Sequence, residues 1–150
     1  MTAKTSTIVD VRNFTRRSAP GFPYTKIADT VLPHWEISLV FAGTTRAQNL
    51  NIALRNKSYI PNVLSYESGK HSGEIIICLP VAEKQAQLYG VSYPHFVVFL
   101  FIHGLLHLKG LPHGTTMERH ECTSLKRFTG ASISYDDNDI DNGTTNRNRH

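Results

Sequence analysis

Three histidines in the last third of the chain have the spacing of a metal site. His103 and His107 are four residues apart, and His113 follows six residues later. Side chains four apart share one face of a helix, with Cβ atoms roughly 5–6 Å apart. Gly110 can take the positive φ that ends a helix, so the chain can bring His113 back to the same ion. Three imidazoles leave the fourth position of tetrahedral zinc open to water, which is typical of a catalytic site.

The residue after the first histidine argues against one kind of chemistry. The spacing H-x-x-x-H-x-x-G-x-x-H is also that of the metzincin proteases, in which Glu follows the first His. That Glu is the general base of peptide hydrolysis, and this chain has Gly104 in its place. The metal geometry is therefore retained without the protease base. We interpret Gly104 as a small residue that lets the helix pack closely against a neighbour.

Length and composition indicate one soluble, cytoplasmic domain. A chain of 150 residues, 40% of them hydrophobic, can bury a core. The longest apolar run, Phe96–Ile102, has seven residues, whereas a membrane span needs about 20. The N-terminus shows no long apolar segment of the kind found in signal peptides. Cys78 and Cys122 lack CxxC spacing, so we expect reduced thiols.

Positive charge is concentrated in the first part of the chain. Residues 1–60 carry eight Lys/Arg and three Asp/Glu, a net charge of +5, whereas residues 61–150 carry eight and nine, a net charge of −1. This asymmetry is compatible with a polyanionic partner. The sequence has no long Lys/Arg run that would coat nucleic acid, and nothing points to DNA specifically. The basic residues of the first part include Arg12, Arg16, Arg17, Arg46, Arg55 and Lys57.

Hydrophobic periodicity predicts an α/β (α+β) fold, with a small mixed β-sheet of about four strands packed with several helices. The helix with the first two histidines is apolar almost all round, which indicates a central, buried metal-binding helix. The third and fourth strands could pair as an antiparallel hairpin. Strands are expected over 7–12, 35–42, 63–66 and 73–79, and helices over 23–32, 46–56, 81–89, 94–108 and 115–128.

Polar residues mark the helix and domain boundaries. Thr44 or Thr45 is expected to cap the second helix, and Thr115 or Thr116 the last one. Residues 136–150 are polar apart from Ile140, and such a composition cannot bury enough surface to fold. We therefore expect a single domain over residues 1–135 and a disordered tail over 136–150.

The histidine motif and several upstream segments resemble one family, the YbeY endoribonucleases. His103–His113 is similar to the family signature H-G-x-L-H-L-x-G-x-x-H. The similarity spans roughly residues 35 to 128, and its matching parts occur in the family's order. The other matches are Asn51 and Arg55, the segment Pro61–Tyr66, the strand Gly73–Ile77, and Met117 and Glu121 in the last helix.

The resemblance implies a site and a substrate. It implies a zinc ion bound by His103, His107 and His113, and a basic cleft that faces the ion. Arg55 takes the place of the family's arginine and is expected to be catalytic and to bind substrate phosphate; we add Lys57 as a second substrate-binding residue. The implied activity is cleavage of single-stranded RNA, in maturation of the 3′ end of small-subunit ribosomal RNA and in ribosome quality control. Ribosomal RNA and the small ribosomal subunit are the implied partners.

The chain departs from the family pattern near its third histidine. The family usually has Tyr-Asp before that histidine, where this chain has Leu111-Pro112. A carboxylate that could orient a metal ligand is therefore missing or is supplied elsewhere. The interval from His113 to Met117 is also shorter than usual, so metal affinity and activity are expected to be weaker than typical of the family.

Zinc suits a mechanism that uses water as the nucleophile. Zinc lowers the pKa of bound water to about 7, so no adjacent carboxylate is needed, and Arg55 would stabilise the developing charge on the phosphoryl oxygens. We expect hydroxide attack on the phosphodiester, which leaves a 5′-phosphate and a 3′-hydroxyl. Nickel, copper or another divalent ion could also bind the imidazoles.

Two other functions remain open from the sequence. The protein could be another zinc hydrolase of the peptidase kind, with Glu118 or Glu121 as its base. It could instead be a ribosome-assembly module whose metal is structural, and such a metal needs a fourth protein ligand. Cys122 is a conceivable ligand of that kind.

Overall fold

A four-stranded mixed sheet forms the frame of the protein. The computed structural model describes residues 6–133, so the predicted tail lies outside the described residues. The spatial order is β1-β2-β4-β3; the first three strands in this order run parallel, and β3 is antiparallel to β4. The predicted α/β fold class and the hairpin are confirmed. The strands are β1 (Ile8–Asn13), β2 (Glu36–Ala42), β3 (Val63–Gly69) and β4 (Ser72–Cys78).

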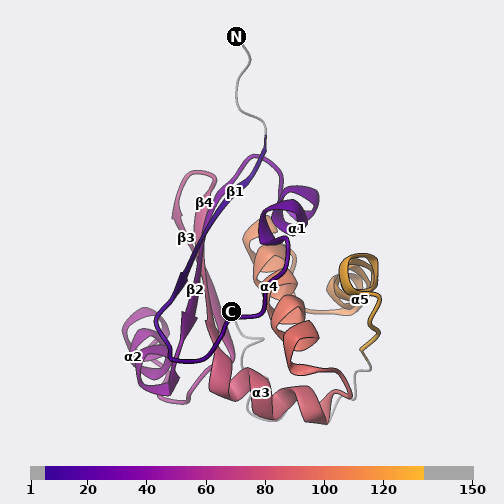
Figure 1. Cartoon of the computed structure of the whole chain (residues 1–150). Coiled ribbons are helices and arrows are strands. Elements are labelled where there is room, and N and C mark those ends of the chain that lie inside the picture. Colours follow the sequence, from indigo (N-terminus) through magenta and orange to yellow (C-terminus); the bar gives the residue numbers. More distant parts are fainter. Residues whose placement is uncertain (1–5, 134–150) are drawn as a thin grey trace.

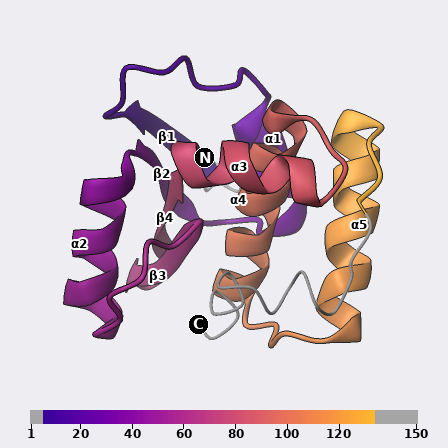
Figure 2. The same ribbon diagram turned by 90° about the horizontal axis from the view of Figure 1, so that it is seen from below.

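Helices cover the two faces of the sheet unequally. Figure 1 shows α2 on one face and α1, α4 and α5 on the other, and in Figure 2 α4 lies between the sheet and α5. The alternation of side chains in the strands produces two apolar clusters, a large one around α4 and a small one on the α2 side. The helices are α1 (Tyr24–Val31), α2 (Thr44–Arg55), α3 (Leu79–Leu88), α4 (Tyr93–Lys109) and α5 (Thr115–Thr129).

Helix α4 is the buried central helix that the sequence predicts. Its side chains are buried without interruption from Phe96 to Leu106. Ser92 caps its start, because the Ser92 hydroxyl accepts a hydrogen bond from the His95 N–H at 3.3 Å. Gly110 ends it with φ 102°, a conformation that glycine adopts without strain. The predicted end at Gly110 is thereby confirmed, and the helix extends one residue beyond each predicted bound, from Tyr93 to Lys109.

No described helix is by itself long and apolar enough to cross a membrane. Helices α3 and α4 pass such a test of length and composition when taken together, but they are bent by 107° relative to each other.

Gly104 lets α4 lie close to the sheet. A Cβ atom at this position would lie 3.0–3.2 Å from three side-chain carbons of Ile75, which is fully buried on β4. A larger residue would push the helix away from the strand or force Ile75 to move. Our interpretation of Gly104 as a packing residue is confirmed.

The predicted caps of two helices are wrong. Thr44 and Thr115 already lie inside the first turns of α2 and α5, and the capping positions are Gly43 and Gly114, neither of which has a side-chain cap bond. Threonine is a good capping residue, but glycine is also accepted there and precedes each threonine pair. The backbone of Gly114 has φ 150°, which favours glycine over threonine at that position.

Candidate metal centre

The three predicted histidines come together where α4 ends. The nitrogen atoms that each could offer to a metal all lie within 4.8 Å of one another. The ring centroids of His103 and His107 are 4.6 Å apart, and that of His113 lies 5.1 Å and 4.5 Å from them. The first two rings project from adjacent turns of α4, and the turn at Gly110 returns the third to them. The spacing of the three histidines therefore predicts correctly that their rings come together.

A buried carboxylate orients the first histidine. His103 Nδ1 is hydrogen-bonded to a carboxylate oxygen of Glu121, which lies on α5, and the two residues are 6% and 2% exposed. His103 Nε2 is buried and has no hydrogen-bond partner within residues 6–133. A buried ring nitrogen without a partner is costly unless an ion or water binds it. Because metal-binding histidines usually donate their other N–H to a carboxylate, the arrangement fits a divalent metal.

The three histidines become more exposed along the chain. His103 is buried, His107 is half-buried and His113 is exposed. An ion bound among them would therefore have protein on one side and solvent on the other. This is the arrangement of a site that keeps an open position for water or substrate.

A groove of about 430 Å³ lies beside His107. Ser65, Tyr66 and Glu67 of β3 line one of its sides, and Leu108 and Pro112 are among the residues on the other. Burial and the hydrogen bond to the Glu74 carboxylate raise the pKa of Tyr66 to about 12, so its hydroxyl stays protonated and donates to Glu74. The resemblance implies a basic cleft facing the ion, but no Lys or Arg is among the residues that line this groove, which arises from contact between β3 and the end of α4.

The structure disfavours Glu121 as a hydrolytic base and Cys122 as a metal ligand. Glu121 is buried and engaged by His103, which removes it from the role of hydrolytic base. Within the described residues the metal-ligand group consists of the three histidines and does not include Cys122. Burial, followed by the nearby charges of Glu121 and Glu118, raises the pKa of the Cys122 thiol and disfavours the thiolate that zinc requires.

Glu121 has a different role from the one suggested by sequence alone. The carboxylate that orients His103 comes from a residue 18 positions away on another helix, not from a neighbour of His113. The pair Met117 and Glu121, noted in the sequence, includes the carboxylate that contacts His103. Both side chains are buried, one turn apart on α5. The spacing could indicate a buried carboxylate but could not indicate which histidine it contacts.

Arg55 lies at the end of α2, on the face of the sheet opposite α4. Its guanidinium donates through Nη1 to the Tyr59 hydroxyl at 2.7 Å and to Asn51 Oδ1 at 3.2 Å. Asn51 is fully buried and its side-chain amide donates to the Tyr59 carbonyl, so these residues hold the arginine in place. Lys57 is exposed two residues later. Among the described contacts, none joins Arg55 or Lys57 to the three histidines.

Fold and site together define a class of protein. It is a small α/β domain with a three-histidine centre, open to solvent, at the end of a buried helix, and its first ligand is oriented by a carboxylate. Comparison with known proteins gives the family. The model of the family described as Endoribonuclease YbeY matches residues 5–133. The chain therefore belongs to the YbeY endoribonuclease family, which places it among the nucleases that act on RNA.

Individual relatives agree with this assignment, and a solved structure shares the fold. The chain is 38% identical over 103 residues to Endoribonuclease YbeY of Thiobacillus denitrificans, covering 62% of this chain and 70% of the relative. It is 35% identical over 95 residues to that of Bdellovibrio bacteriovorus, covering 62% and 61%. A Thermotoga maritima protein solved in solution has the same fold, with a TM-score of 0.60, 17% identity, and coverage of 82% of this chain and 90% of that one.

Proposed function

We propose that this protein is a zinc-dependent endoribonuclease specific for single-stranded RNA. Its proposed task is to mature the 3′ end of small-subunit ribosomal RNA and to act in ribosome quality control, in the cytoplasm and in contact with the small subunit. The observation that supports the metal chemistry best is the meeting of three histidines around a buried, unpartnered ring nitrogen of His103. Family membership supports the RNA substrate.

His103, His107 and His113 would hold the ion. A zinc ion there would lower the pKa of a bound water to about 7 and so supply a nucleophile at neutral pH. Glu121 fixes the His103 ring with Nδ1 toward the carboxylate, which leaves Nε2 as the ligand atom. Gly104 provides no base. The protein would therefore orient the histidine ligands and leave one side of the ion open to solvent, rather than abstract a proton. Nickel or another divalent metal is compatible with the same imidazoles.

Arg55 would bind the phosphate that is cleaved. Within residues 6–133 its hydrogen bonds use Nη1, so Nη2 and Nε can donate to two phosphoryl oxygens. A guanidinium held by Asn51 and Tyr59 loses little conformational freedom on binding, which favours stabilisation of the charge that develops during cleavage. Lys57 would add attraction for RNA without a fixed geometry.

The mechanism can be tested with an RNA that carries one 2′-deoxy sugar at the cut site. If an external water attacks, this substrate is cleaved and the products carry a 5′-phosphate and a 3′-hydroxyl. A chelator should abolish cleavage, and zinc should restore it. Complete resistance of the deoxy substrate, with cyclic phosphate ends on ordinary RNA, would contradict the mechanism.

The cellular role can be tested separately. Cells depleted of the protein should accumulate small-subunit ribosomal RNA with extended 3′ ends, which mapping of those ends would reveal. Normal 3′ ends after complete depletion would contradict the ribosomal role but not the nuclease activity.

A further inference from the structure

An exposed aromatic ring and an arginine meet at the start of α2, far along the helix from Arg55. Phe14 continues β1 by one residue, since its N–H donates to the Phe41 carbonyl at 2.9 Å. The Arg46 guanidinium lies over the Phe14 ring, 4.3 Å from its centroid. The Phe14 residue is nevertheless 51% exposed. A large apolar ring is thus held at the surface with a cation on one of its faces.

The charge around this ring is not balanced. Two arginines of the same segment have acidic partners: Arg12 pairs with Asp10 at 3.2 Å, and Arg17 pairs with Glu83 at 2.6 Å. Arg16 and Arg46 are exposed, and within residues 6–133 neither forms an ion pair with an acidic side chain. Arg46 over the Phe14 ring and Arg16, two positions after Phe14, are therefore exposed cations without an acidic partner among the described residues.

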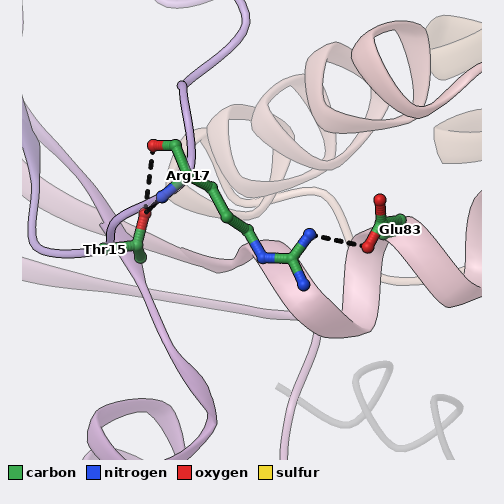
Figure 3. Close-up of polar contacts among 3 residues, drawn as sticks. All are labelled: Thr15, Arg17 and Glu83. Atoms are coloured by element: carbon green, nitrogen blue, oxygen red, sulfur yellow. Dashed lines mark hydrogen bonds and ion pairs between the residues drawn. The ribbon is translucent and has the colours of Figure 1, made fainter.

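The loop that carries Phe14 and Arg16 is fixed at both ends. Asn13 accepts hydrogen bonds from the Thr15 N–H and hydroxyl, and the Thr15 hydroxyl accepts from the Arg17 N–H at 3.1 Å. Figure 3 shows Arg17 reaching from this turn to Glu83 on α3. Arg17 is therefore used to anchor the loop. A surface that is already ordered loses less entropy when it binds a partner.

We infer that Phe14, Arg16 and Arg46, called here the Phe14 patch, bind single-stranded RNA away from the metal centre. Exposed aromatic rings stack on bases of any sequence, and arginine binds phosphate and also stacks on ring faces. The inference rests on the proposed RNA substrate and adds a second contact for it. Arg46 and Arg55 are nine residues apart on α2, roughly 14 Å along the axis. A single strand that contacts both arginines must therefore span this distance along its backbone.

The test is equilibrium binding of fluorescently labelled RNA, measured by anisotropy in the presence of a chelator so that no cleavage interferes. The probe is a single strand of twelve nucleotides, measured over a range of salt concentrations. The variants are Phe14→Ala, Arg16→Ala and Arg46→Ala in the full chain. Arg127→Ala is the matched control, because Arg127 also lies over a phenylalanine ring, that of Phe128 at 5.5 Å, but on α5. Melting curves show whether each variant folds.

Substitutions in the Phe14 patch should weaken RNA binding, and the control substitution should not. Arg46→Ala and Arg16→Ala should each weaken twelve-nucleotide binding roughly three- to tenfold and lower the salt slope by about one. Phe14→Ala should weaken it about fivefold or more with less change in the slope. Arg127→Ala should show less than a twofold change.

Some outcomes would overturn the inference. Binding of the twelve-nucleotide RNA by all three folded variants within twofold of the parent would do so, and so would an equal loss in Arg127→Ala. Because the measurement needs no cleavage, it fails or succeeds independently of the proposed nuclease mechanism. If the patch binds RNA but the protein does not cleave it, only the proposed nuclease mechanism is contradicted, and the inference about the patch stands.

Discussion

The proposed metal centre at the end of α4 and the basic surface of α2 differ in how deeply their side chains are buried. His103 and Glu121 are almost completely buried, and they lie on two helices packed against each other. Arg55 is half-buried and held by its own helix and the following loop, whereas Lys57 and Arg46 are exposed. The most deeply buried groups of the proposed metal centre, His103 and Glu121, are thus held by two packed helices. The groups that would attract RNA lie on a surface helix, where a flexible strand can reach them.

The metal ligands should show the largest effect. His103→Ala removes a ligand and leaves Glu121 buried without its partner, so metal content and cleavage should both fall far more than the 10–100-fold typical of losing an outer partner. Metal content after purification and initial cleavage rates give the measurement. His120→Ala, an exposed histidine of α5 outside the group of three, should keep both. A full equivalent of metal in His103→Ala would rule out the site.

Arg55→Lys should have the next largest effect. Lysine keeps the charge but lacks the planar group that can hold two phosphoryl oxygens, so kcat should fall on the order of 100-fold. The melting temperature and metal content should stay close to those of the parent protein. Arg119→Lys, at an exposed position on α5, is the matched control. If Arg55→Lys cleaves RNA at the normal rate, Arg55 is not part of the site.

Glu121→Gln should lower metal affinity by about 10–100-fold, since it removes the charge that orients His103 while keeping the shape of the side chain. Competition with a coloured chelator measures the affinity. Glu36→Gln, an exposed carboxylate at the start of β2, should leave the affinity unchanged. A metal affinity equal to that of the parent would mean that Glu121 contributes to packing only. The contrast between a buried centre that binds the metal and an exposed surface that binds RNA would then lose its main support.

The histidine cluster was predictable from the sequence, whereas the contacts around it were not. The histidine site was predictable because its residues lie within eleven positions, where helix periodicity and one glycine determine the geometry. The contact between His103 and Glu121 joins two helices, and the groove beside His107 joins a helix to a strand. Neither follows from local spacing, because tertiary packing decides which faces meet. The incorrect capping residues have a different cause: glycine and threonine are both acceptable caps, so propensity could not choose between neighbours.

Gly104→Ala should reduce stability rather than activity. The added methyl would meet Ile75 at 3.0–3.2 Å in a fully buried place, and overpacking of this kind costs about 1–3 kcal/mol. Alanine's better helix propensity offsets up to about 1 kcal/mol of that cost. Thermal unfolding should show a lower melting temperature than that of Gly21→Ala, where nothing lies within 4 Å of the new methyl. Unchanged stability would mean that α4 can move away from β4 easily.

The smallest effect is expected at Lys57. Its side chain is exposed, so its attraction for a phosphate is screened by water and salt and is worth at most about 1 kcal/mol. Lys57→Ala should raise KM about twofold at low salt and leave kcat unchanged, and the difference should vanish as salt is added. Lys84→Ala, an exposed lysine on α3, should change neither quantity. A large fall in kcat for Lys57→Ala would mean that the loop after α2 closes on the substrate and fixes the lysine there. The contrast between a held Arg55 and a loosely attracting Lys57 would then be wrong.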